Sequence, residues 1–342
     1  MENTNIDWSN LGFNYSKTDK RYVATCKNGK WEKGKLIEDE TITLNESAGV
    51  FQYAQTCFEG LKAYTAKNGK VVVFRPDLNA KRMADTCKRL CIPELPKEMF
   101  LDAVEQVVKA NASYVPPFGT SASLYLRPFI IGSSPVIGVQ ACEEYHFRLF
   151  ALPVGSYFKG GLAPIKIMVS DFDRAAPNGT GDIKAGLNYA MSLYASKLAK
   201  AQGYAENMFL DAKTRTYVEE AGGANFIFVT KDKKIVTPKS DSILPSITRR
   251  SLLVVAKEIL GYEVEERKIR LDEVENFAEC GLCGTAAVIS PVGLIHTKEK
   301  DIIFNGDETV VGPVIKELYK TLVGIQLGEI DPPADDWVRE IV

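Results

Sequence analysis

The sequence is poor in histidine, with only His146 and His296 among 342 residues. A Ser-His or Cys-His nucleophile pair needs one of these two residues, and neither has a nucleophile motif nearby. Cys280 and Cys283 have the spacing of half a zinc site, but no second cysteine pair of that spacing follows. A four-ligand zinc site therefore lacks material, and we predict no metal.

Long apolar runs are also missing. No window reaches the roughly 20 apolar residues of a membrane span, and residues 1–20 are too polar for a signal peptide. The seven cysteines are odd in number and scattered along the chain, which is typical of reduced thiols rather than of a disulfide framework. These features predict a cytoplasmic protein, with Cys280 and Cys283 as two small buried thiols.

An excess of charge of one sign is absent as well. The 42 Lys and Arg residues nearly balance the 44 Asp and Glu residues. The basic pairs Lys81-Arg82 and Arg249-Arg250 lie among apolar residues at helical spacing, so no element carries the basic stripe of a nucleic-acid binder. We expect small-molecule partners, and neither nucleic acid nor membrane.

The length of the chain exceeds what one hydrophobic core usually serves, so two domains are expected. The segment Pro153-Val-Gly-Ser-Tyr-Phe-Lys-Gly-Gly161 combines proline, glycine and aromatic residues between two strand signals, and is predicted to be the linker. The predicted domains are a smaller N-terminal α/β domain over 1–152 and a larger C-terminal domain over 162–342.

Strands and helices alternate in the pattern of the sequence. Apolar and alternating runs predict strands over 71–74, 123–131, 145–152, 165–169, 208–210 and 225–229. Helical spacing predicts helices over 77–90, 191–200 and 247–260, and another that Pro96 opens. A Pro-Val-Gly turn is predicted before His296. The fold class is therefore α/β, or α+β, in two layers.

A lysine between glycines carries the first chemical signal, in Gly179-Thr-Gly-Asp-Ile-Lys-Ala-Gly-Leu-Asn-Tyr189. Most lysines are solvated surface groups. Glycines, however, let the backbone approach a ligand closely, and a desolvated lysine becomes a nucleophile suited to Schiff-base chemistry. Lys184 is therefore the candidate catalytic residue.

Two further segments fit a phosphorylated pyridine cofactor. Glu219 and Glu220 precede small residues and an apolar strand, and a carboxylate facing a pyridine nitrogen keeps that nitrogen protonated. A solvated turn is the alternative. Ile243-Leu-Pro-Ser-Ile-Thr-Arg-Arg250 opens a helix whose amide groups suit a phosphate. A plain helix capped by Ser246 is the alternative there. The Thr285 hydroxyl could join the same phosphate.

Six ordered blocks resemble the branched-chain aminotransferases, which are class IV, fold-type IV pyridoxal-phosphate enzymes. They are Phe58-Glu-Gly-Leu-Lys-Ala-Tyr64, Phe74-Arg-Pro76, Leu124-Tyr-Leu-Arg127, Gly181-Asp-Ile-Lys-Ala-Gly-Leu-Asn-Tyr189, Glu220-Ala-Gly-Gly-Ala-Asn225 and Gly284-Thr-Ala286. The resemblance runs from about Phe13 to beyond Pro291. Six blocks in order form a specific signal, whereas any one of them is weak.

The resemblance implies pyridoxal 5′-phosphate as cofactor and assigns its contacts. Lys184 would form the internal aldimine and shuttle a proton, Tyr189 would bind the phenolic oxygen, and Glu220 rather than Glu219 would face the pyridine nitrogen. Arg75, Ile247, Thr248 and Thr285 would bind the phosphate, while Leu244 would pack against the ring.

The same resemblance implies a substrate site and an assembly. The residues that would line the site are Phe13, Tyr53, Phe58, Tyr125, Tyr157 and Ala286. Arg127 would receive the second carboxylate of glutamate, so that one pocket accepts both an aliphatic side chain and a carboxylate. Without the resemblance, Phe13, Tyr53 and Phe58 would be interpreted as ordinary core residues. The family forms homodimers with the active site at the subunit interface, so we expect at least a dimer.

Departures from the family pattern are few. Ala287 and Ser290 stand where some members carry a redox-active Cys-x-x-Cys, so that switch should be absent. Cys280 and Cys283 lie upstream and are not equivalent. Gly223 stands where some members have a hydroxyl residue, so that contact would be missing or made by water.

The function implied is reversible, ping-pong transamination between leucine, isoleucine or valine and 2-oxoglutarate. A D-amino-acid aminotransferase or an aminodeoxychorismate lyase is the nearest alternative, because those enzymes share the cofactor residues. Phe58-Glu-Gly and Tyr125-Leu-Arg127 favour the branched-chain type. A non-catalytic regulatory protein of the same fold is an alternative of another class, which the presence of Lys184, Glu220 and Arg75 disfavours.

Overall fold

The structure is a computed structural model that describes residues 6–155 and 161–342. The chain divides into two compact units. Unit 1 comprises residues 1–157, 183–187 and 325–342, and unit 2 comprises residues 158–182 and 188–324. The single linker expected at 153–161 stays a prediction, because 156–160 lie outside the described residues. By packing, residues 183–187 and 325–342 group with unit 1.

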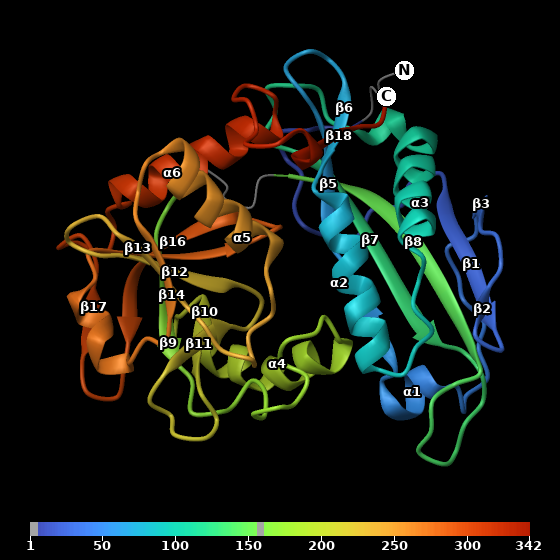
Figure 1. Ribbon diagram of the computed structural model, residues 1–342, viewed down its shortest axis with the longest axis horizontal. Coiled ribbons are helices and arrows are strands. Elements are labelled where there is room, and N and C mark those ends of the chain that lie inside the picture. Colours follow the sequence, from blue (N-terminus) through green and yellow to red (C-terminus); the bar gives the residue numbers. More distant parts are fainter. Residues whose placement is uncertain (1–5, 156–160) are drawn as a thin grey trace. The chain divides into compact units, whose positions relative to one another are not determined.

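Unit 1 contains an antiparallel sheet with the strand order β18-β6-β5-β7-β8-β1-β2, to which β3 adds at β1 and β4 adds at β7. Its strands are β1 (Arg21–Lys27), β2 (Lys30–Trp31), β3 (Lys35–Ile37), β4 (Thr56–Phe58), β5 (Leu61–Thr65), β6 (Val71–Phe74), β7 (Ser123–Gly132), β8 (Glu144–Val154) and β18 (Val338–Glu340). The last strand of the chain thus pairs with β6, which lies far from it in sequence (Figure 1).

The helices of unit 1 are α1 (Gly49–Tyr53), α2 (Pro76–Arg89) and α3 (Lys97–Ala110), followed by a 3-10 turn over Ala112–Tyr114. Figure 1 shows α2 and α3 lying along the sheet. On α3, Phe100, Val104, Val107 and Val108 are buried, as the helical spacing of apolar residues predicts. These side chains join one core with Phe147 of β8.

Unit 2 contains a mixed sheet with the order β11-β10-β9-β16-β15-β12-β13-β14, and β17 pairs with β16. Its strands are β9 (Ile165–Val169), β10 (Glu206–Leu210), β11 (Val218–Ala221), β12 (Asn225–Val229), β13 (Ile235–Pro238), β14 (Val264–Arg267), β15 (Glu279–Gly284), β16 (Val288–His296) and β17 (Asp301–Ile303). Because β11 also pairs with β12 at Glu220 and Asn225, the strands from β11 to β12 close into a ring.

The remaining helices are α4 (Gly186–Ala201), α5 (Ile247–Val254) and α6 (Pro313–Gln326). Five residues of π-helix, Val255–Ile259, extend α5. Two 3-10 turns cover Leu271–Asn276 and Asp335–Trp337. The core of unit 2 is rich in phenylalanine: Phe226 and Phe228 stack at 5.5 Å between ring centroids, and Phe228 stacks on Phe277 at 4.8 Å.

Most predicted elements are confirmed, including the strands at 71–74, 165–169 and 225–229. The helix predicted over 247–260 is confirmed to Ile259, although it is α-helical only to Val254 and π-helical from Val255. One predicted element is wrong. The turn predicted before His296 is instead part of β16, where Pro291 pairs with Gly281 and the register shifts between Val292 and Leu294. A bulge there accommodates the glycine that suggested a turn.

Candidate active site

Lys184 lies beside β4 in unit 1. Its backbone carbonyl accepts a hydrogen bond of 3.2 Å from the Phe58 N–H, and its own N–H donates to Thr86 Oγ1 at 3.1 Å. Ala185 forms an isolated antiparallel bridge with Cys57. The lysine is half-buried, and its Nζ lies 4.8 Å from the centre of the Phe58 ring. The backbone of Lys184 is therefore held by β4 through its carbonyl and by Thr86 of α2 through its N–H.

Four predicted substrate residues form one cluster in unit 1. Tyr125 and Arg127 are two residues apart on β7, so their side chains share one face of the sheet. The Arg127 guanidinium lies 4.9 Å from the Phe58 ring centre and 5.3 Å from that of Tyr125, and its Nη2 donates to the Tyr125 hydroxyl at 3.1 Å. Phe13 contacts the Tyr125 ring edge-on at 5.1 Å.

Arg127 is the polar member of this aromatic cluster. Its Nε is buried and has no hydrogen-bond acceptor within the part of the chain that the structure describes. A buried guanidinium N–H without an acceptor is costly, and an anionic ligand removes that cost. The cluster thus offers an apolar lining together with a hydrogen-bond donor for a carboxylate.

The predicted roles of two tyrosines find no support in the described contacts. Tyr53 ends α1, is 39% exposed, and donates its hydroxyl hydrogen to the Ile137 carbonyl. Tyr157 lies outside the described residues. The structure therefore leaves the predicted roles of both tyrosines untested.

Lys62 is a buried residue next to the cluster that the sequence analysis did not single out. It lies on β5 directly across from Tyr125 of β7 and is 9% exposed. Burial lowers the pKa of its amine from 10.5 to about 8. The available signal was a lysine within the apolar run Leu61–Thr65.

Arg75 separates β6 from α2 and is half-buried. Its backbone is left-handed, with φ 46° and ψ 47°. The guanidinium carbon lies 4.3 Å from the centre of the Trp337 ring. Burial lowers the pKa of the guanidinium, while the charges of Asp77 and Asp336 act in the opposite direction.

Glu220 is a buried and multiply bonded carboxylate of unit 2. It lies on β11, is 2% exposed, and accepts hydrogen bonds from the Leu244 N–H at 2.9 Å and from Asn225 Nδ2 at 2.8 Å. Arg174 Nη1 lies 2.7 Å from its Oε1. The neighbouring Glu219 points to the other face and accepts from Ser240 Oγ at 2.8 Å. The alternative of a solvated turn is therefore wrong for this pair.

The start of α5 provides amide groups in unit 2. Ser246 caps the helix by accepting from the Arg249 N–H, at 3.2 Å to Oγ. The cap thus uses the backbone N–H of Arg249 and not those of Ile247 or Thr248. Ile247 and Thr248 are both buried, with exposures of 5% and 6%. Leu244, two residues before the cap, is also buried. A capped helix and a phosphate-binding site are compatible here. The cap uses the Arg249 N–H, whereas the predicted phosphate donors are the N–H groups of Ile247 and Thr248.

The other predicted cofactor residues of unit 2 lie at ends of elements. Thr285 and Ala286 form the turn of the β15–β16 hairpin and are half-buried. Tyr189 is half-buried in the first turn of α4. Val288, which follows the hairpin turn, has a positive φ of 63°, unusual for a β-branched residue. Such strain is typical of functional turns.

Cys280 and Cys283 are buried in β15 with exposures of 1% and 0%, which confirms the prediction of small buried thiols. Burial raises the pKa of the Cys283 thiol to about 12 and that of Cys280 well above its ordinary value. All seven cysteines are free. No group of three potential metal ligands occurs among the residues that the structure describes.

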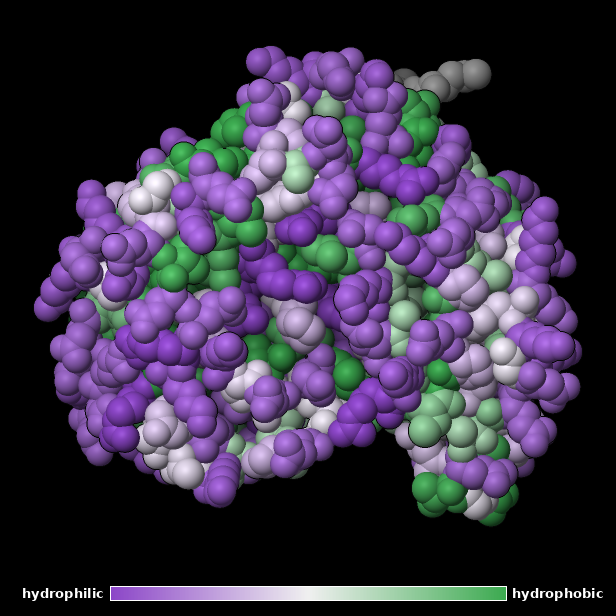
Figure 2. All heavy atoms as spheres, viewed as in Figure 1, coloured by the Kyte–Doolittle hydropathy of each residue, from purple (hydrophilic) through white to green (hydrophobic). Residues whose placement is uncertain are grey.

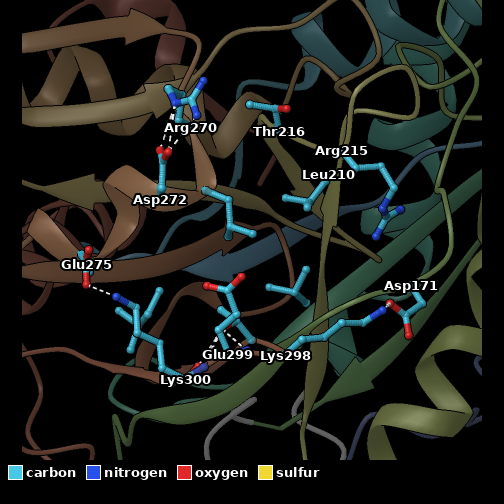
Figure 3. A pocket seen from close by; sticks show the side chains of 14 residues that line it. Asp171, Leu210, Arg215, Thr216, Arg270, Asp272, Glu275, Lys298, Glu299 and Lys300 are labelled. Carbon is cyan, nitrogen blue, oxygen red and sulfur yellow. Dashed lines mark hydrogen bonds and ion pairs between the residues drawn. The ribbon is translucent and has the colours of Figure 1, made fainter.

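A surface pocket of about 430 Å³ in unit 2 contains none of the predicted site residues. Figure 3 shows its charged rim, where Arg270 pairs with Asp272 at 2.7 Å, Lys298 with Asp171 at 2.6 Å, and Lys300 with Glu275. Exposed pairs of this kind contribute little energy and neutralise one another. The rim therefore offers no unbalanced charge for a ligand.

The comparisons with known proteins agree with this geometry. The profile of the family "amino-transferase class IV" matches residues 56–295. A branched-chain-amino-acid aminotransferase of Haemophilus influenzae is 50% identical over 98% of this chain and 99% of that protein. Its counterpart in Helicobacter pylori is 48% identical over 98% of both.

Solved structures show the same similarity. The Escherichia coli branched-chain amino acid aminotransferase superposes with a TM-score of 0.81 at 28% identity, covering 95% of this chain and all of that one. The Thermobaculum terrenum enzyme, solved in its pyridoxal-phosphate form, shares the fold with a TM-score of 0.79 at 24% identity, covering 96% and 100%. The chain belongs to the class IV aminotransferases. Within that class it belongs to the branched-chain-amino-acid aminotransferases.

Proposed function

We propose that this chain catalyses reversible transamination of L-leucine, L-isoleucine and L-valine with 2-oxoglutarate, using pyridoxal 5′-phosphate. The observation that carries the substrate assignment is the placement of Arg127 within the ring cluster of Phe58 and Tyr125. Aromatic faces suit an aliphatic side chain, and the buried Nε suits the second carboxylate of glutamate. Ping-pong transamination needs an apolar lining and a carboxylate-binding group in one pocket.

The residues present fit the cofactor. A buried carboxylate held by three donors suits a protonated ring nitrogen, and the start of α5 suits a phosphate. We propose that Glu220 faces the ring nitrogen, Tyr189 the phenolic oxygen and Leu244 the ring. We further propose that Arg75, Ile247, Thr248 and Thr285 bind the phosphate. Ala286 and Tyr53 then line the substrate site, with Tyr157 as a further member.

Bound pyridoxal phosphate supplies an electron sink for the carbanion formed at the substrate Cα. The chain's own residues do the rest. Lys184 would hold the cofactor and would move the proton between the substrate Cα and the cofactor. Glu220, whose carboxylate is fixed by Arg174, Asn225 and the Leu244 N–H, would keep the ring nitrogen protonated. The rings of Phe13 and Phe58 exclude water from the aliphatic side chain.

We also propose a homodimer or a larger homo-oligomer in the cytoplasm. Met191, Tyr194 and Leu198 recur at helical spacing on α4 and are 56%, 60% and 36% exposed. In unit 1, Ile137 and Val139 are 77% and 88% exposed, and Figure 2 shows hydrophobic surface over this loop between β7 and β8. Apolar residues grouped in this way are typical of interfaces. No described helix is long and apolar enough to cross a bilayer.

The test combines a covalent label with an activity panel. Borohydride treatment of the purified holoprotein, followed by peptide mapping, should place the reduced cofactor on Lys184. Lys184→Ala should lose transamination, whereas Lys197→Ala, an exposed lysine on α4, should retain it. The panel compares L-leucine with D-alanine and aminodeoxychorismate, each at matched concentration. A label elsewhere, or turnover of D-alanine ahead of L-leucine, contradicts the proposal.

A further inference from the structure

Trp337 links the end of the chain to the arginine proposed to bind phosphate. The residue is 3% exposed and immediately precedes β18, whose Val338 pairs with Phe74 of β6. Its carbonyl accepts a hydrogen bond of 2.8 Å from the Arg75 N–H. Its ring contacts Phe74 edge-on at 5.7 Å. Backbone and ring together anchor Trp337 at the point where β6 ends.

The guanidinium of Arg75 lies over that ring, with the Arg75 Cζ 4.3 Å from its centre. Stacking engages the flat face of a guanidinium and not its in-plane N–H groups, which are the groups that hydrogen-bond a phosphate. The ring therefore covers one side of the guanidinium and limits the directions in which those donors can point. Tryptophan is also the aromatic residue that attracts a cation most strongly.

The backbone of Arg75 needs such support. It adopts φ 46° and ψ 47° directly before Pro76, although a residue before proline is normally extended and a left-handed arginine is uncommon. Strained conformations persist only where neighbouring groups over-determine them. The hydrogen bond to the Trp337 carbonyl and the stacked ring are two such constraints, and both come from the C-terminal segment.

We infer that Trp337 is a positioning residue for cofactor binding, which orients the Arg75 guanidinium toward the phosphate of pyridoxal phosphate. The inference rests on the proposed phosphate-binding role of Arg75. It gives the C-terminal segment Asp335–Glu340 a function in cofactor affinity in addition to completing the unit-1 sheet.

The decisive measurement compares two ligands of the apoprotein, pyridoxal phosphate and pyridoxal, which differ only in the phosphate. Trp337→Met should weaken pyridoxal phosphate by about 5- to 30-fold, the range of a desolvated cation–π contact. It should leave pyridoxal within about 2-fold. A general loss of structure would instead weaken both ligands equally, so that result overturns the inference, as does an unchanged affinity for both.

Two further variants sharpen the comparison. Trp337→Phe keeps a smaller aromatic face. Its ratio of pyridoxal phosphate affinity to pyridoxal affinity should lie between those of the wild type and Trp337→Met. The test therefore does not depend on the folding of Trp337→Met. If only Trp337→Phe folds and its affinity ratio equals that of the wild type, the inference is contradicted.

Trp31→Leu is the matched control, because Trp31 is a partly buried tryptophan of unit 1 whose Nε1 donates to the Pro93 carbonyl. Its ratio should equal that of the wild type.

A double-mutant cycle separates this inference from the proposed role of Arg75. Arg75→Ala alone should lower the ratio of the pyridoxal phosphate affinity to the pyridoxal affinity. Adding Trp337→Met to Arg75→Ala should lower this ratio no further, since both changes remove the same interaction. If Arg75→Ala leaves the ratio unchanged, the phosphate role of Arg75 is wrong. If Arg75→Ala lowers the ratio and Trp337→Met does not, only the positioning role of Trp337 is wrong.

Discussion

Arg174 and Glu220 form a buried ion pair in unit 2, with 2.7 Å between Nη1 and Oε1 and 3% exposure of both side chains. Arg174 comes from the segment after β9, and Glu220 lies where β11 meets β12. Desolvation favours the neutral form of a carboxyl group, and an adjacent guanidinium, which is always charged, opposes this effect. The guanidinium of Arg174 therefore offsets part of the cost of burying the Glu220 carboxylate.

Arg174→Met should lower the free energy of unfolding of the apoprotein by about 3–5 kcal/mol, because it leaves a buried charge without its partner. Urea unfolding at a fixed protein concentration measures the change. Arg270→Met is the control, since its pair with Asp272 is largely exposed and should contribute less than about 1 kcal/mol. The double variant Arg174→Met/Glu220→Gln should recover part of the loss. Equal effects of Arg174→Met and Arg270→Met would contradict this account.

Lys62 should make stability depend on pH above neutrality. Its pKa is about 8 in the folded chain, against an ordinary 10.5. Between these values the unfolded chain binds more protons than the folded chain, so the free energy of unfolding rises with pH. Relative to Lys62→Met, the wild type should gain up to about 3 kcal/mol from pH 8 to pH 10.5. Urea unfolding across this range tests it, and parallel pH profiles would refute it.

Arg127→Met should separate the two half-reactions. Loss of a hydrogen bond to a charged group costs about 1.5–3 kcal/mol, so kcat/KM for 2-oxoglutarate should fall roughly 10- to 150-fold. The value for leucine should change by less than about 3-fold, because the rings of Phe58 and Tyr125 remain. Single-turnover measurements of each half-reaction give both values. Equal losses for both substrates would show that Arg127 maintains the pocket rather than recognising the carboxylate.

The thiols should react in two classes. Cys91 is exposed and the other six cysteines are buried, and thiol reactivity requires access and ionisation. Titration of the native protein with dithiobis(nitrobenzoate) should release one equivalent rapidly, and the denatured protein should release seven. Cys91→Ser should abolish the rapid phase without changing activity. Rapid modification of Cys280 or Cys283 would contradict the burial of β15.

Local patterns were sufficient for most of the fold. The strands β6 and β12 and the helix α3 follow from short apolar runs and helical spacing, which depend only on neighbouring residues. The change from α-helix to π-helix after Val254 and the bulged strand through Gly293 were missed. At Gly293 the pairing of β16 with β15 and β9 overrides the local turn signal of Pro-Val-Gly.

The sequence by itself determined the class of enzyme and indicated the candidate residues for its chemistry. Lys184 between glycines, Glu220 before small residues and Arg75 before Pro76 stand in motifs whose order along the chain is typical of that class. Tertiary structure alone decided which distant residues contact these candidate residues and the substrate cluster. The Trp337 ring lies against the Arg75 guanidinium, Arg174 pairs with Glu220, and Lys62 lies across from Tyr125. These partners are brought together by strand pairing and chain closure, and no local pattern specifies which distant residue a side chain will meet.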